Sequence, residues 1–219
     1  MAVANGIQTV DGIWVINSDT DPRTGGGLVA PKGSIASASD GSGTFTKIGT
    51  LNTDWANVPN VIFTQTANKN ISSSTTETTL FGTGVGTLTL PADFFTAGKD
   101  IRIIIRGFLS RLSGNITVRF KLGTTTIIST ATVSSGIASS DGFEIIVDCT
   151  CRTTGVTGTV IAQGKFNNLS SGTILEMVSI ATTTIDTTVS QAIDTTLQFS
   201  INNAGNTITS TNTTIEVLN

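Results

Sequence analysis

The chain has 219 residues, enough to bury a real core in one domain, or in one domain with a smaller appendage. Hydrophobic residues make up 38% of it and charged residues only 12%, which excludes a disordered polar chain. The net charge is −3 and no segment concentrates Lys or Arg, so we expect no nucleic-acid partner.

The types of residue that dominate the chain favour strands. Thr and Ile are β-branched and fit a pleated surface better than a helix, so the sequence predicts a β-rich protein with a hydroxyl-covered surface. The first residues, 1–6, lack a basic region followed by an apolar run, and we expect no secretory signal. No apolar stretch approaches the ~20 residues that span a bilayer, so we expect no membrane contact.

The two cysteines are Cys149 and Cys151. Residues two apart in a strand share a face, but their Cβ atoms are too far apart for an unstrained disulfide. Unpaired thiols fit a chain made in a reducing cytoplasm. Because the sequence has no histidine to complete a ligand set, we expect no metal site and no cofactor, and we expect both thiols to face the core.

Residues 1–60 combine short apolar pieces with closely spaced turn signals. They predict an extended N-terminal arm and one or two small β-hairpins, too short to form a core alone. One hairpin is expected between residues 34–39 and 44–48. Both tryptophans, Trp14 and Trp55, lie in this part of the chain. We expect them to anchor its packing and to be candidate interface residues, since Trp is enriched at binding hot spots.

From about residue 61 the pattern becomes a series of strands separated by Gly, Ser, Asn and Asp turns. In residues 115–122, apolar and polar side chains alternate cleanly. Eight such segments predict an all-β antiparallel sandwich or barrel over residues 61–219. They are residues 100–109, 115–122, 124–133, 143–152, 157–166, 174–183, 195–201 and 207–218. The one local helical candidate is a single turn at residues 91–97.

Several of these strands carry large apolar residues on both faces. Only one face of each sheet meets the core of a sandwich, so an apolar outer face is normally covered by another element or subunit. We therefore expect a homo-oligomer. The candidate interface residues on these outer faces are Ile104, Phe108, Ile146 and Ile161.

Residues 30–58 contain a recurrent pattern. It runs Ala30-Pro31-Lys32-Gly33-Ser34-Ile35, Asp40-Gly41, Phe45-Thr46-Lys47-Ile48-Gly49 and Asn52-Thr53-Asp54-Trp55. This succession of a Pro-x-Gly-Ser start, an Asp-Gly turn, an aromatic-x-Lys strand and a closing Asp-Trp resembles a short module of tailed-phage virion proteins. The resemblance implies a small hairpin closed by the Trp.

The region 80–218 is similar to the jelly-roll domains of phage head-decoration and fibre proteins. It opens with Leu80-Phe81-Gly82-Thr83-Gly84-Val85-Gly86 and runs through Leu90-Pro91-Ala92-Asp93-Phe94-Phe95. The resemblance implies a jelly-roll-like sandwich, a trimer, many copies per particle and synthesis in the host cytoplasm. It brings no functional residues across, because such modules are scaffolds.

Three patterns that suggest chemistry have simpler explanations. The glycine-rich stretch 82–86 leads into an extended segment and not into a helix, which favours a hairpin over a phosphate loop. Histidine, the commonest base for nucleophilic catalysis, is absent. Glu144 and Asp148 lie four residues apart on one strand, roughly 13 Å, longer than the ~5–9.5 Å of glycosidase pairs. We therefore expect no enzyme.

Two groups of charged residues leave alternatives open. The segment Asp19-Thr20-Asp21 is an ordinary turn start, or part of a surface ion site shared between subunits. Arg102, Arg106, Arg119 and Lys121 are expected on outward faces of adjacent strands, as a solvated face or as a polar contact with a neighbouring shell protein.

The sequence thus predicts a capsid decoration, or cement, protein of a phage virion. Residues 1–60 would anchor it to the major capsid protein, and residues 61–219 would form the oligomerisation domain. The main alternative is a receptor-binding tail-fibre tip or head fibre that recognises a host glycan through loops 134–141 or 153–157. A glycan-processing enzyme is a third, weaker alternative.

Overall fold

The computed structural model describes residues 4–10, 13–23, 27–39, 43–58, 60–131 and 138–218. Every regular element in these ranges is a strand, which confirms the all-β class. None of these ranges holds a helix long and apolar enough to cross a membrane. The chain divides into two compact units, residues 1–60 with 218–219, and residues 61–217.

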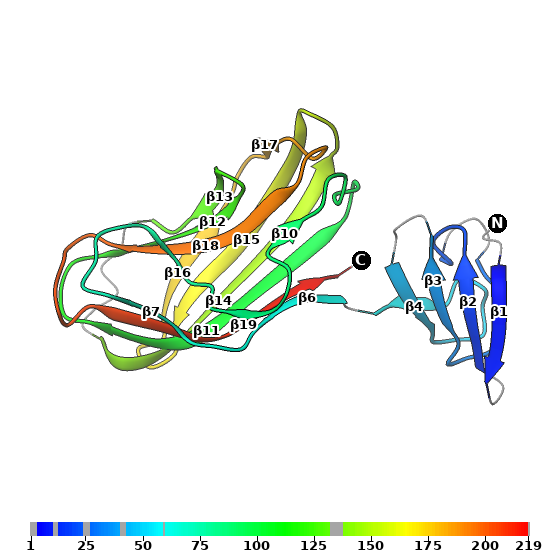
Figure 1. The fold of residues 1–219 in the computed structure, drawn as a ribbon, viewed down its shortest axis with the longest axis horizontal. Helices are drawn as coiled ribbons and strands as arrows, with labels where there is room; N and C mark the ends of the chain where they lie inside the picture. The colour runs from blue at the N-terminus through cyan, green and yellow to red at the C-terminus, as the bar shows by residue number, and fades with distance from the viewer. Residues whose placement is uncertain are drawn as a thin grey trace. The chain divides into compact units, whose positions relative to one another are not determined.

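The N-terminal unit contains one five-stranded sheet, drawn in blue tones in Figure 1. The strands follow one another in chain order across the sheet, and all pairs are antiparallel except the parallel pair β2–β3. They are β1 (Ala4–Val10), β2 (Ile13–Ser18), β3 (Ile35–Ala38), β4 (Gly43–Lys47) and β5 (Trp55–Asn57). The predicted hairpin is confirmed as β3 and β4, with Ile35 opposite Thr46.

The prediction of an extended arm without a core is wrong. Alternate residues of β2, β3 and β4 and Trp55 at the start of β5 point to one face of the sheet, and Leu28 from the segment before β3 packs against them. The buried cluster consists of Ile16, Leu28, Ala36, Ala38, Phe45 and Trp55. Each segment is too short to bury a core by itself, but five strands paired in one sheet provide a continuous surface for the loops to cover.

The larger unit, residues 61–217, holds two sheets packed face to face (Figure 1). Its strands before residue 100 are short: β6 (Asn60–Gln65), β7 (Lys69–Ser72), β8 (Thr78–Thr79), β9 (Gly84–Gly86) and β10 (Thr89–Leu90). The longer ones follow: β11 (Asp100–Arg111), β12 (Ile116–Leu122), β13 (Thr125–Ser129), β14 (Ala138–Thr153), β15 (Gly158–Asn168), β16 (Thr173–Val178), β17 (Thr183–Ile185), β18 (Gln191–Phe199) and β19 (Thr207–Val217).

The chain crosses repeatedly between the two sheets. The large sheet has the order β16-β15-β14-β11-β19-β6-β9, with β7 also paired to β19 and β17 to β15. The small sheet has the order β10-β18-β12-β13, with β8 also paired to β18. All strand pairs in the described part of these sheets are antiparallel, so the predicted antiparallel sandwich is confirmed.

The core lies between the sheets and follows the predicted alternation. In β12, Ile116, Val118, Phe120 and Leu122 are buried while the intervening side chains are only partly so. The odd-numbered residues from Phe143 to Cys151 on β14 are buried in the same way, and Phe143 stacks on Phe166 with ring centroids 5.5 Å apart. The period of two therefore placed the core face of both strands correctly.

Three local predictions differ from the structure. Residues 91–97 form turns and no helical turn, and Asp93 has a φ of 58°, which lies outside the right-handed helical region. The strand predicted over 174–183 ends at Val178, and β17 begins only at Thr183. The strand predicted over 124–133 is described as far as residue 131, and within that range it ends at Ser129.

Candidate functional site: interaction surfaces

The residues of the phage-like motif meet in the core of the N-terminal unit. Trp55 is buried, and its indole Nε1 donates hydrogen bonds to the carbonyl oxygens of Leu28 at 3.1 Å and Asn52 at 2.9 Å. Lys47 is buried as well. Its Nζ lies 5.2 Å from the centre of the Trp55 ring and donates a hydrogen bond to the Leu51 carbonyl. The aromatic-x-Lys and Asp-Trp parts of the motif therefore hold each other in place.

The start of the motif fixes the other side of this unit. Gly33 has a φ of 89°, which favours glycine, and the next residue, Ser34, is fully buried. The Ser34 hydroxyl accepts a hydrogen bond from the Trp14 backbone N–H at 3.0 Å. Trp14 itself is partly buried against the same cluster as Trp55. Both candidate tryptophans thus lie where the structure uses them for packing.

The outer face of the large sheet brings together two of the four apolar residues singled out there. Ile104 on β11 lies directly opposite Ile146 on β14, and both are partly buried. The next outward-facing pair on each side is an ion pair, Arg102–Asp148 at 2.7 Å and Arg106–Glu144 at 2.7 Å. The apolar pair Ile104–Ile146 is therefore a narrow stripe between two cross-strand ion pairs.

The other two residues lie apart from this stripe. Phe108 is 56% exposed and faces Gly142 across the strand pair, four residues further along β11 than Ile104. Ile161 is partly buried and lies opposite Thr150, four residues along β14 from Ile146. The structure thus does not gather the four residues into one patch.

The predicted face of four basic residues is wrong. Arg102 and Arg106 belong to β11 in the large sheet, whereas Arg119 and Lys121 belong to β12 in the small sheet. Consecutive strands of the chain lie in different sheets here, because the connection crosses the sandwich. The first pair, Arg102 and Arg106, binds Asp148 and Glu144, the two carboxylates whose spacing argues against a glycosidase pair.

The second basic pair binds a single carboxylate on the small sheet. Glu77 lies 3.3 Å from Arg119 and 3.2 Å from Lys121, and it accepts a hydrogen bond from the Thr196 hydroxyl at 2.8 Å. The Thr196 hydrogen bond, supported by the two cations, holds the pKa of Glu77 below its ordinary value. This cluster ties the segment before β8 to the outer face of β12 and β18.

The two thiols are buried side chains of the sandwich core. Cys149 and Cys151 are free and lie on the inner face of β14. Burial raises the pKa of both thiols, so they stay protonated at neutral pH. No cluster of three or more potential metal-ligating side chains occurs in the described ranges. In the segment 19–21, Asp21 forms an ion pair with Arg23 at 2.6 Å.

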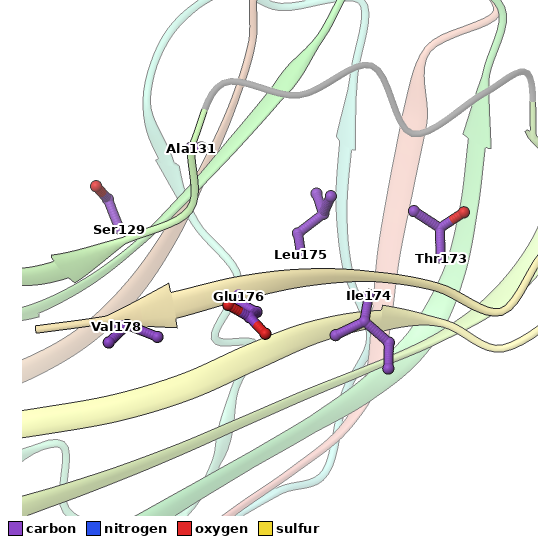
Figure 2. Close-up of a pocket in the computed structure, with 7 residues that line it drawn as sticks. All are labelled: Ser129, Ala131, Thr173, Ile174, Leu175, Glu176 and Val178. Atoms are coloured by element: carbon purple, nitrogen blue, oxygen red, sulfur yellow. The ribbon is translucent and has the colours of Figure 1, made fainter.

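Two edge strands, β13 of the small sheet and β16 of the large sheet, approach each other along one side of the sandwich. Among the described strands, β13 is bonded only to β12, and β16 only to β15. Between them lies a hollow of about 570 Å³, whose lining residues are shown in Figure 2. They are Ser129, Ala131, Thr173, Ile174, Leu175, Glu176 and Val178. We call this side of the molecule, with the adjoining residues 179–183, the β13/β16 edge.

A second hollow of about 430 Å³ continues this edge, since it shares Ser129 and Val178 with the first. Figure 2 shows Thr173 and Leu175 on one side of β16 and Ile174 on the other, as expected of a strand. The sequence interpretation missed this edge. The signal was present, because Ile174, Val178 and Ile180 give this segment an apolar second face of the kind already noted on other strands.

The loops considered for glycan binding are only partly described. In loop 134–141, residues 134–137 lie outside the described residues. In loop 153–157, the Gly155 N–H donates to the Thr187 hydroxyl at 2.8 Å, and Thr153 and Thr159 share a hydrogen bond of 2.8 Å. Comparison with known proteins found no match, either to a protein-family model or to a curated protein sequence.

Proposed function

We propose that this chain is a structural virion protein of a tailed bacteriophage that decorates and stabilises the assembled capsid. The N-terminal unit binds the major capsid protein, and the sandwich joins copies into a trimer. The observation that carries the proposal is the packing of the motif residues. Four motif residues, Ser34, Phe45, Lys47 and Trp55, are buried in a compact unit with its own core, as expected of a module that recurs in virion proteins.

The order of the strands supports the jelly-roll part of the proposal. In a jelly roll, two Greek keys nest so that the first strand of the series pairs with the last. Here β7 pairs with β19, β8 with β18, β11 with β14, and β12 with β13. Members of each successive pair belong alternately to the large and the small sheet. Strands β15 to β17 then extend the large sheet beyond β14.

The mechanism we propose is thermodynamic. A protein that binds only the assembled shell lowers the free energy of that state by its binding free energy. Three anchoring units on one trimer bind neighbouring sites with a high effective concentration, so the gain per particle exceeds that of one unit. A surface poor in charge and rich in hydroxyls suits such close contact between many copies.

The test is to mix the purified protein with undecorated phage heads and, separately, with host cells. The proposal predicts saturable binding to heads, as trimers, and a higher temperature of head disruption. Binding to cells without binding to heads would favour the alternative, a receptor-binding fibre protein. Hydrolysis of a host polysaccharide would revive the enzyme alternative.

A further inference from the structure

Exposed apolar side chains gather on the β13/β16 edge. Ile174 is 54% exposed, Val178 53% and Ile180 98%, and all three fall within seven residues. Single exposed apolar residues are ordinary on a protein surface, but a group beside a hollow is not. The Ile104–Ile146 stripe, by comparison, is partly buried between its flanking ion pairs.

The same edge carries backbone groups that can bind a further strand. An edge strand presents unpaired N–H and C=O groups along one side, and proteins that stay monomeric cover or blunt such edges. Within the described residues, β16 and β13 each have one bonded neighbour. The edge therefore offers both main-chain hydrogen-bonding groups and apolar side chains to whatever binds it.

Two charged side chains beside the edge indicate the nature of that occupant. Lys165 on β15 lies opposite Glu176 on β16. In the described part of the chain, neither of these two side chains forms an ion pair or a hydrogen bond. The neighbouring outward charges on the same sheet, Arg102 with Asp148 and Arg106 with Glu144, are paired. A surface with one unpaired base beside one unpaired acid is electrostatically complementary to another copy of itself.

We infer that the β13/β16 edge is the surface through which one copy of this chain binds a second copy. Around the three-fold axis of the proposed trimer, Lys165 of each copy meets Glu176 of the next copy, while Ile174, Val178 and Ile180 become buried at the contact. This inference rests on the proposed self-assembly and names the surface that performs it. It also assigns the Ile104–Ile146 stripe a smaller part in self-association than the sequence suggested.

The first test uses charge reversal in full-length protein, with the assembly state read by light scattering after gel filtration. K165E places two acids at the contact, and E176K places two bases. Each variant alone should assemble about tenfold or more weakly than the natural chain. A mixture of the two variants should partly recover mixed trimers, because opposite charges then face each other at two of the three contacts between copies. A change that acted only within one copy could not be rescued by mixing.

The second test addresses the apolar part of the contact. Ile180→Asp should dissociate the oligomer, whereas Val156→Asp should not, although Val156 is also 69% exposed and lies on a different connection. Circular dichroism should show both variants folded, as expected for exposed positions.

Three outcomes would overturn the inference. If the natural chain assembles and all edge variants assemble equally well, self-assembly stands but the edge does not carry it. If the variants stay trimeric but lose binding to undecorated heads, the edge belongs to the contact with the shell. If the natural chain is a monomer at concentrations that saturate heads, the edge has no copy to bind, although decoration of the shell stands.

Discussion

The two units of the chain bury their cores in different ways. In the N-terminal unit one face of a single sheet, with Leu28 from a connecting segment, forms a buried cluster of six described residues. In the sandwich each sheet covers the other, and the buried cluster holds 33 described residues. The stability of a unit with six buried residues depends heavily on the largest of these side chains. In a unit with 33 buried residues, truncation of any one side chain removes a smaller share of the stabilising contacts.

This difference can be measured because each unit carries its own reporter. Both tryptophans lie in residues 1–60 and both cysteines lie in residues 61–217, while the chain has no tyrosine. Tryptophan fluorescence therefore reports unfolding of the N-terminal unit alone. Reaction of the buried thiols with a coloured thiol reagent reports opening of the sandwich alone.

The largest expected effect is from Trp55→Ala. Removing a buried Trp costs about 3–5 kcal/mol, which approaches the whole stability of a 60-residue unit. The fluorescence of the remaining Trp14 should show an unfolded N-terminal unit at room temperature, while the thiols stay unreactive. If the thiols became reactive as well, the two units would have to unfold together.

The matching change in the sandwich is Ile145→Ala. Ile145 is fully buried on β14, and its truncation should cost about 2–5 kcal/mol. The sandwich should remain folded, with a lower midpoint for thiol exposure in urea. The fluorescence transition of the N-terminal unit should be unchanged. A shift in both transitions would show that the units are energetically coupled.

An intermediate effect is expected at alkaline pH, and only in the sandwich. Burial raises the pKa of Cys149 in the folded state, so the folded protein keeps a proton that the unfolded chain releases above pH of about 8.5. The stability contributed by this thiol is fully present below that pH and falls by about 1.4 kcal/mol per pH unit above it. Calorimetry should show this slope, and Cys149→Ala should reduce it.

The smallest effect is expected from Glu77→Gln on the small sheet. The pKa of Glu77 is lower in the folded protein than in the unfolded chain. Glu77 therefore adds to the free energy of unfolding at a pH above its unfolded pKa, and this stabilisation is lost as the pH falls through the folded pKa. Because the Glu77 side chain is partly exposed, we expect the variant to lose about 1 kcal/mol or less of unfolding free energy at neutral pH. Urea titrations at pH 7 and at pH 3 should differ less for the variant than for the natural chain. An equal difference would mean that Glu77 contributes nothing to the acid dependence.

The sequence predicted the sandwich better than the N-terminal unit, for a physical reason. In β12 and β14 the period of two runs through seven or more residues, so the core face follows from local pattern alone. In residues 1–60 the strands are short, and the buried cluster on their sheet is completed by Leu28 from a connecting segment and by Trp55 of β5, which lie outside the local pattern of β2. The parallel pairing of β2 with β3 is likewise not encoded in any local turn.

The candidate surfaces were predicted least well. Ile104 lies between two arginine–carboxylate pairs, and pairing across strands depends on register, which the sequence alone does not give. Which strands lie at the edges of a sheet depends on the complete strand order. The β13/β16 edge could therefore not be located from the pattern of one strand. The apolar second face of residues 174–180 was visible, but its place at an edge was not.

We propose that this protein is a shell component whose N-terminal unit binds the capsid and whose sandwich joins copies together. The most direct test of this proposal is electron cryomicroscopy of the intact particle, compared with particles lacking the protein. We expect trimeric density on the outer surface of the head that is missing from the particles without the protein. Density at the tail only, or identical images of the two particles, would contradict it.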